Sequence, residues 1–130
     1  MSEGIDDQIE ANLERAETSL GAARKLLKDD YPDFSASRAY YAAFYAATAL
    51  LLSRDISRSK HSGTIAAIHQ YFIKPGHLSV KHGEEIRKLF ELRNVGDYGS
   101  TQHVGPQDAS RAIEMAEQFV NAATELLSKT

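Results

Sequence analysis

The sequence predicts an all-α fold: an up-and-down antiparallel bundle of four to five helices, in a single domain that spans residues 1–130. Three observations carry this prediction. Apolar residues recur at alternating steps of four and three along most of the chain, which is the spacing of amphipathic helices. No segment shows the strict alternation of a half-buried strand. Short glycine-, proline- and polar-rich connections separate the helical stretches, as is typical of antiparallel bundles.

A first helix is predicted by an apolar series with this spacing: Ile5, Ile9, Leu13, Ala16, Leu20, Ala23 and Leu27. The segment 29–33 ends it, because the residue before Pro32 is pushed out of helical geometry. Asp33 or Ser35 is the predicted N-cap of the next helix.

The stretch from Ala39 to Ser53 contains no charged residue and is expected to form the central helix, from about Phe34 to Ser53. Its apolar side chains fall on every side of a helical wheel, and such a helix must be covered all round. Two ridges of alanine would let neighbouring helices approach closely: Ala39, Ala43 and Ala47, and Ala42, Ala46 and Ala49. The stretch is too short for a membrane span, so burial inside the bundle is predicted and no membrane association.

Three further helices follow. A polar, basic loop over residues 54–63 leads into the third, with Ser59 or Ser62 as its cap and Pro75-Gly76 as its end. Its buried face is predicted to contain Ile65, Ile68 and Phe72, with Ala66 and Tyr71 beside them.

The fourth helix is predicted to begin at a cap formed by Ser79 and to end in the run from Gly96 to Gly105. Its apolar face is Ile86, Leu89, Phe90 and Leu92. The fifth opens with Pro106 in its first turn and Asp108 beside it. Its wide apolar face is formed by two parallel series: Ala109, Ile113, Ala116, Val120, Ala123 and Leu127, and Ala112, Met115, Phe119, Ala122 and Leu126.

Composition excludes several kinds of function. The chain has no cysteine, so neither a disulfide framework nor a thiolate zinc site is available. The five histidines lack the spacing of a metal site on one helical face, and no motif marks a nucleophilic serine, so no metal and no cofactor are expected. The first seven residues are acidic and lack the apolar run of a secretory signal, and a cytoplasmic location is expected.

The charge is unevenly distributed. A net charge of −3 argues against a surface that attracts nucleic acid overall, because such binding neutralises phosphates with Lys and Arg. Between Arg54 and Arg93, however, there are eight Lys or Arg against four acidic residues, and four of the five histidines lie there. This local basic region suits one anionic ligand better than a long duplex.

The first candidate site is the segment Arg93-Asn94-Val95-Gly96-Asp97-Tyr98. If the fourth helix continues through it, Arg93 lies on the side that faces the bundle, where a guanidinium needs an anion or several acceptors. Asp97, four residues on, is within reach. The structural alternative is an ordinary helix-end ion pair between Arg93 and Asp97, with Tyr98 as a core aromatic residue.

The second candidate is the helix start Arg58-Ser59-Lys60-His61-Ser62-Gly63. Free backbone N–H groups, the positive end of a helix dipole, a lysine and hydroxyl groups together suit a phosphate. The segment lacks the glycine spacing of a true phosphate loop, and a solvated, capped loop is the alternative interpretation.

Three motifs occur in a fixed order: Ser-Arg-Ala-Tyr-Tyr-Ala-Ala-Phe-Tyr-Ala-Ala at 37–47, Ser-Lys-His-Ser-Gly at 59–63 and Arg-Asn-Val-Gly-Asp-Tyr at 93–98. Together they resemble the HEPN domains (higher eukaryotes and prokaryotes nucleotide-binding), in particular the small stand-alone prokaryotic branch. The resemblance extends from the first helix to the last. It implies a bundle of four or five helices that commonly forms a homodimer.

The resemblance also implies two kinds of activity. Many members are metal-independent RNases or toxin components, in which an Arg, the polar residue after it and a His a few residues further on meet near the dimer axis. Others are partnered by a minimal nucleotidyltransferase, which in some pairs transfers AMP to a Tyr just past that His. Arg93 and Asn94 match the first two residues, but Asp97 and Tyr98 stand where the His is expected, and His103 lies ten residues beyond Arg93.

We therefore expect a non-catalytic or weakly catalytic HEPN-type domain that associates with a nucleotide or RNA. It would be homodimeric and partnered by a minimal nucleotidyltransferase in a toxin–antitoxin-like system. Arg93, Asn94 and Asp97 would form the site of any catalysis. Lys60 and His61 would bind phosphate together with Arg93, and Tyr98 is the candidate for modification.

Two alternatives stay open. One is a metal-independent RNase, in which Arg93 orients the phosphate and His103 or His61 serves as acid or base. The other is a purely structural helical interaction module.

Overall fold

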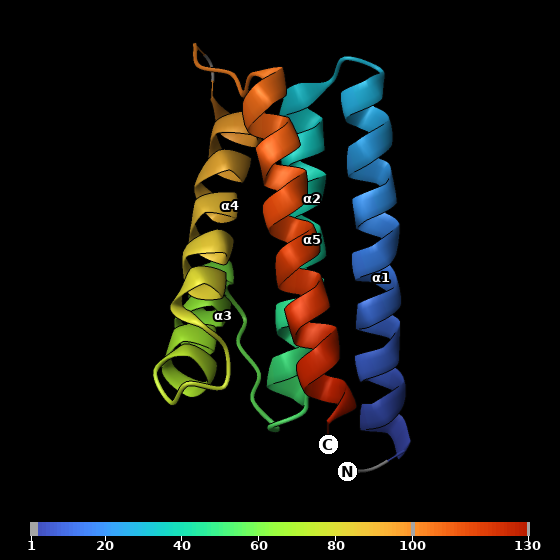
Figure 1. Cartoon of the computed structure of the whole chain (residues 1–130), viewed down its shortest axis with the longest axis vertical. Coiled ribbons are helices and arrows are strands. Elements are labelled where there is room, and N and C mark those ends of the chain that lie inside the picture. The colour runs from blue at the N-terminus through green and yellow to red at the C-terminus, as the bar shows by residue number, and fades with distance from the viewer. Residues whose placement is uncertain (1–2, 100, 130) are drawn as a thin grey trace.

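The computed structural model describes residues 3–99 and 101–129, and in this part of the chain it contains helices and no strand (Figure 1). The elements are α1 (Glu3–Lys28), α2 (Pro32–Leu52), α3 (His61–Ile68), the π-helix η1 (His69–Ile73), α4 (Val80–Tyr98) and α5 (Pro106–Ser128). Residues 1, 2, 100 and 130 of the predicted domain lie outside the described part. In Figure 1 the four long helices run side by side, and α3 lies beside the lower half of α4. The predicted all-α antiparallel bundle is confirmed.

The central helix is α2, which packs against α1, α3, α4 and α5. Both predicted alanine ridges are fully buried, with no exposed surface on any of their six members. Small side chains allow this close packing on several sides, while Tyr40 and Leu50 add buried volume. The helices that surround α2 bury their predicted faces: Ala16, Leu20 and Ala23 in α1, Ile86 and Leu89 in α4, and Ala109, Ala116, Phe119 and Val120 in α5.

The predicted caps of α2 are wrong. The helix begins at Pro32, two residues earlier than expected, because proline fits the first turn of a helix, and its N-cap Tyr31 makes no side-chain cap hydrogen bond. Asp33 instead accepts hydrogen bonds from the Val104 backbone N–H at 2.6 Å and from His103 Nδ1 at 2.8 Å. Ser35 Oγ donates to the Ala23 carbonyl at 2.7 Å. Both side chains therefore tie α2 to other segments.

The third helix differs from its prediction at its start, and it ends at Ile73, shortly before Pro75-Gly76, as predicted. Its N-cap is Lys60, and neither Ser59 nor Ser62 caps it through a side chain. Its last turn is the π-helix η1, in which the Lys74 N–H reaches back to the His69 carbonyl at 2.8 Å. Of its predicted apolar face, the side chains of Ile65, Ile68 and Phe72 are buried, whereas Ala66 is exposed. Ser79 occupies the N-cap position of α4 as predicted, but its side chain makes no cap hydrogen bond.

Gly96 lies within α4 rather than at its end, and the helix continues to Tyr98. A β-carbon at Gly96 would lie 2.6 Å from the Asp33 carbonyl oxygen. The absence of a side chain is therefore what lets the end of α4 approach the first turn of α2.

Replacing Gly96 by alanine should lower the free energy of unfolding by about 1–3 kcal/mol, because backbone must move to relieve the overlap. Gly21 in α1 is the matched control, since it is helical and exposed, and a β-carbon at this position would have no other atom within 4 Å. Gly21→Ala should raise stability by about 0.5–1 kcal/mol. Urea unfolding followed by circular dichroism measures both changes in the free energy of unfolding. Equal effects of the two substitutions would contradict the close approach of α4 to α2 at Gly96.

None of the helices in residues 3–99 and 101–129 combines the length and the apolar character that a membrane span needs.

Candidate functional site

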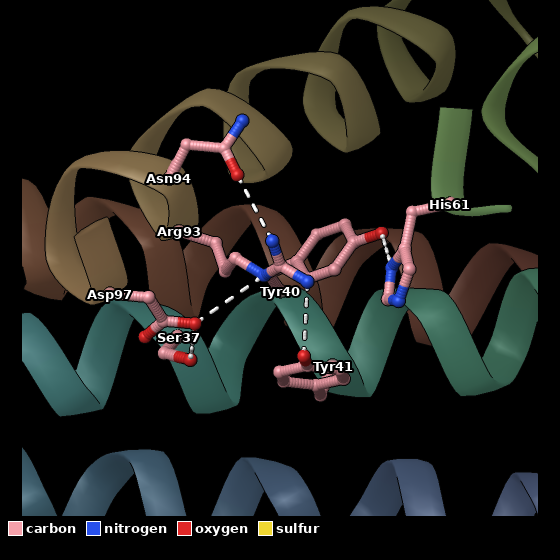
Figure 2. Close-up of polar contacts among 7 residues, drawn as sticks. All are labelled: Ser37, Tyr40, Tyr41, His61, Arg93, Asn94 and Asp97. Atoms are coloured by element: carbon pink, nitrogen blue, oxygen red, sulfur yellow. Dashed lines mark hydrogen bonds and ion pairs between the residues drawn. The ribbon is translucent and has the colours of Figure 1, made fainter.

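Arg93 lies in the interior between α4 and α2, where aromatic rings enclose its guanidinium (Figure 2). Only 7% of the residue is exposed. Its Nη2 donates to Tyr41 Oη at 3.1 Å, and its Nη1 donates to Asn94 Oδ1 at 3.0 Å. The guanidinium carbon lies between 5.4 and 5.8 Å from four ring centroids: those of Tyr40, Tyr41, Phe90 and Tyr98. Ring faces attract a cation at these distances, so they offset part of the cost of burying the charge.

Asp97 supplies the negative charge of the cluster. Its Oδ2 lies 3.5 Å from Arg93 Nε in an ion pair, and it accepts a hydrogen bond from Ser37 Oγ at 3.2 Å. Nε itself is buried and makes no hydrogen bond with any residue that the structure describes. The ion pair with Asp97 therefore compensates only part of the cost of burying this donor.

Tyr40 connects this cluster to the start of α3. Its ring is fully buried and faces Arg93, and its Oη shares a hydrogen bond of 2.7 Å with His61 Nδ1, with the donor set by the histidine tautomer. His61 stacks on Phe44 with ring centroids 4.3 Å apart. Figure 2 shows the resulting row of polar groups, from Asp97 through Arg93 and Tyr40 to His61.

Helical spacing explains why these side chains meet. One face of α2 presents residues three or four apart: Ser37, Tyr40, Tyr41 and Phe44. One face of α4 has the same spacing: Phe90, Arg93, Asn94 and Asp97. Because α2 and α4 pack against each other, the two faces form one buried layer.

Burial and the nearby arginine set the protonation states in this layer. Burial raises the pKa of the Tyr40 phenol well above its usual range, against the opposing effect of Arg93, so the hydroxyl stays protonated. The pKa of His61 is lowered, first by burial and then by Arg93. Burial alone would lower the pKa of Arg93, but the hydrogen bond to Tyr41 and the other tyrosines raise it overall, so the guanidinium stays charged. The arrangement pairs a fixed cation with a neutral imidazole.

The lowered pKa of His61 predicts a pH-dependent stability. As the pH falls, the unfolded chain protonates this imidazole at a higher pH than the folded chain does. The contribution of neutral His61 to the free energy of unfolding is therefore complete above about pH 6.5, and it is lost as the pH falls through the lower pKa of the folded state. His69, whose pKa is lowered first by burial and then by Arg87, acts in the same direction. The free energy of unfolding in urea should be measured between roughly pH 7.5 and pH 5. It should depend less on pH in His61→Gln than in the wild type, and His77→Gln, which replaces an exposed histidine, is the control. An unchanged pH dependence in His61→Gln would contradict this account.

The predicted site residues lie in two places. Asn94, Asp97 and Tyr98 surround Arg93, and His61 joins them through Tyr40. Lys60, in contrast, is exposed and makes no side-chain hydrogen bond or ion pair within residues 3–99 and 101–129.

The structure also tests the expectations for Tyr98 and His103. Tyr98 is 73% exposed, so the alternative interpretation of it as a core aromatic residue is wrong. His103, one of the two candidate acid–base groups, pairs with Asp33 at the start of α2 rather than with Arg93.

Sequence reasoning missed Tyr40 and Tyr41 as partners of Arg93, and Ser37 as a partner of Asp97. Their signal was present, because they share one face of the central helix, but helical periodicity alone does not say which face meets Arg93. Among the described residues, no group of three His, Asp or Glu is placed to hold a metal ion.

Comparison with known proteins gives consistent matches. The model of the HEPN domain family matches residues 9–126. A UPF0332 protein of Thermotoga maritima is 37% identical over 119 residues, which cover 92% of this chain and 90% of the relative. A UPF0332 protein of Gloeobacter violaceus is 39% identical over 118 residues, or 90% and 94% of the two chains. A candidate toxin of Methanocaldococcus jannaschii is 33% identical over 120 residues, which cover 92% of this chain and 82% of the relative.

Proposed function

The chain belongs to the HEPN domain family, and from this premise we propose that it is the non-catalytic or weakly catalytic component of a toxin–antitoxin-like pair. Its partner would be a minimal nucleotidyltransferase. Two relatives from Methanocaldococcus jannaschii that are named as candidate toxins, each 33% identical to this chain, support the toxin–antitoxin setting.

The observation that carries the proposal is the position of Tyr98. Its side chain is exposed to solvent, yet its ring centroid lies 5.4 Å from the buried guanidinium carbon of Arg93. A second enzyme can therefore reach the phenol without unfolding the bundle.

The proposed reaction is transfer of AMP from ATP to Tyr98. The phenol oxygen attacks the α-phosphorus, the bond between the α-phosphorus and the bridging oxygen breaks, and pyrophosphate leaves. The phenolic proton passes to a base of the partner enzyme or to water. The product is a phosphodiester with one negative charge on Tyr98.

Weak or absent catalysis by this chain itself is supported by the contacts of Arg93. Both Nη atoms already donate to protein acceptors, and the nearest carboxylate, Asp97, would repel the phosphate that the arginine attracts. No histidine occurs between Asn94 and Gly99 to exchange a proton with a ribose hydroxyl near neutral pH.

Co-expression with a minimal nucleotidyltransferase tests the proposal by intact-mass and peptide mass spectrometry. The expected result is the addition of one AMP per chain, located on Tyr98 and absent in Tyr98→Phe. Tyr31→Phe is the matched control, because Tyr31 is also an exposed aromatic residue, at 53%. An unmodified chain, or AMP on another residue, would contradict the proposal.

A homodimer is part of the same proposal. Phe34 is 57% exposed at the start of α2. Covering this ring with a second copy of the chain would remove apolar surface from water. Sedimentation equilibrium should give twice the chain mass, and Phe34→Glu should give the mass of one chain. A wild-type monomer would contradict this part.

A metal-independent RNase is the second candidate function, and one observation favours it. The pKa of His61 is lowered, and Tyr40 joins this imidazole to the ring layer around Arg93, so a neutral base lies near a fixed cation. Incubation with single-stranded RNA in the presence of a chelator tests it. Cleavage that is lost in Arg93→Ala and His61→Ala but retained in Lys60→Ala would replace the preferred proposal by this one.

A further inference from the structure

A second site lies in the groove between α3–η1 and α4, where Figure 1 shows the short helix beside the lower half of the long one. The groove has a volume of about 680 Å³. Its walls are mainly apolar and include Ile65, Ile73 and Phe90, while Lys74 and Arg87 stand at its rim. Phe90 separates it from the Arg93 cluster, because the same ring lies 5.8 Å from the Arg93 guanidinium carbon. A groove of this size and character can hold a small organic molecule.

The charge at the rim is not balanced by the protein. Lys74 and Arg87 are both exposed, and neither forms an ion pair within the described ranges 3–99 and 101–129. No carboxylate contributes to the lining of the groove. The acidic residues of α4 near Arg87, which are Glu84, Glu85 and Glu91, line a different hollow on the α5 side together with Arg87 itself. The rim therefore favours an anion.

His69 adds an imidazole with one ring nitrogen that is not hydrogen-bonded. Its Nε2 is buried and makes no hydrogen bond with the residues that the structure describes. The ring cannot easily turn away, because its Cε1 would lie 2.6 Å from a β-carbon at Gly83, so it packs directly on the α4 backbone. His69 is also the first residue of the π-helix η1, and π-helical turns often occur at functional sites.

We propose that this groove binds a small organic anion with an apolar body and a single carboxylate or sulfonate head group. The body would pack on Ile65, Ile73 and Phe90, and the head group would pair with Arg87 and Lys74. The ring of His69, which also lines the groove, would pack against the body. A nucleotide fits less well, because the few neutral polar groups of the lining would leave most ribose and base groups without partners.

Titration of the full-length chain with 8-anilinonaphthalene-1-sulfonate, an aromatic sulfonate whose fluorescence rises on burial, tests the proposal together with calorimetry. The expected result is saturable binding of one molecule per chain. Arg87→Gln should weaken it at least about tenfold. Lys88→Gln is the matched control, because it removes the same charge from the next residue of α4, outside the groove.

Ala66→Phe tests the location, because Ala66 is exposed and lines the groove, so a larger side chain fills the space without disturbing the core. Binding should be lost in Ala66→Phe and retained in Ala11→Phe, where an exposed alanine of α1 is replaced in the same way. Circular dichroism verifies that each variant is folded. Wild-type affinity in Ala66→Phe or in Arg87→Gln, absence of saturable binding, or tighter binding of AMP than of the sulfonate would each overturn the proposal.

Discussion

Replacing Tyr40 by alanine is expected to lower the free energy of unfolding by about 3–5 kcal/mol. The ring is fully buried and lies in a cluster of aromatic neighbours, with centroid distances of 5.3 Å to Tyr41, 5.5 Å to Phe90 and 5.9 Å to Phe44. Truncation would leave a cavity in the contact between α2 and α4, and would remove one ring from around Arg93. Urea unfolding followed by far-ultraviolet circular dichroism measures the change.

Tyr40→Phe separates the ring from its hydroxyl. This variant keeps the packing and loses only the hydrogen bond to His61, so a destabilisation of about 1 kcal/mol is expected. Equal effects of the alanine and phenylalanine variants would mean that the hydroxyl, rather than the ring, holds the layer together, and would contradict the packing described here.

Replacing Arg93 by alanine is expected to lower the free energy of unfolding by about 3 kcal/mol. The substitution leaves the Asp97 carboxylate without its counter-charge and the Tyr41 hydroxyl without its donor. The side chain of Asp97 is 23% exposed, so water screens part of its charge and the loss belongs at the low end of the range for buried pairs. Arg93→Lys should restore little, because a lysine cannot present the planar fork that reaches Tyr41, Asn94 and Asp97 together.

Arg24→Ala is the control for this prediction. Arg24 also pairs with a carboxylate, that of Glu117 at 3.0 Å, but both side chains are largely exposed, at 51% and 40%. Such surface pairs contribute about 0–1 kcal/mol. If Arg93→Ala were as mild as Arg24→Ala, the guanidinium would be solvated and the enclosed site would not exist.

The helices could be predicted from the sequence because their signals are local. The apolar spacing of α1 and α5 and the uncharged stretch of α2 each identify an element and its buried face without reference to any other part of the chain. The caps failed for the opposite reason. Asp33 and Ser35 have the right chemistry for capping, but their side chains bond to residues 71 and 12 positions away, and no local pattern reveals such partners.

In the candidate site, too, some features could be predicted from local sequence signals and others could not. The position of Arg93 on the bundle-facing side of α4 and its pairing with Asp97 follow from helical spacing. The aromatic enclosure, the bond from Tyr40 to His61 and the exposure of Tyr98 depend on how α2, α3 and α4 are set against one another. Gly96 is the clearest case, because it reads as a helix end in the sequence and is a contact point between two helices in the structure.

The central claim is that Arg93 is held, charged and enclosed, in the aromatic layer between α2 and α4. The most direct test is the proton–nitrogen NMR signal of its Nε–H group, compared with that of the exposed Arg24. We predict a resolved Arg93 signal that exchanges slowly with water and shows nuclear Overhauser contacts to the ring protons of Tyr40 and Tyr41. An Arg93 signal that exchanges as fast as that of Arg24, without contacts to either ring, would contradict the account.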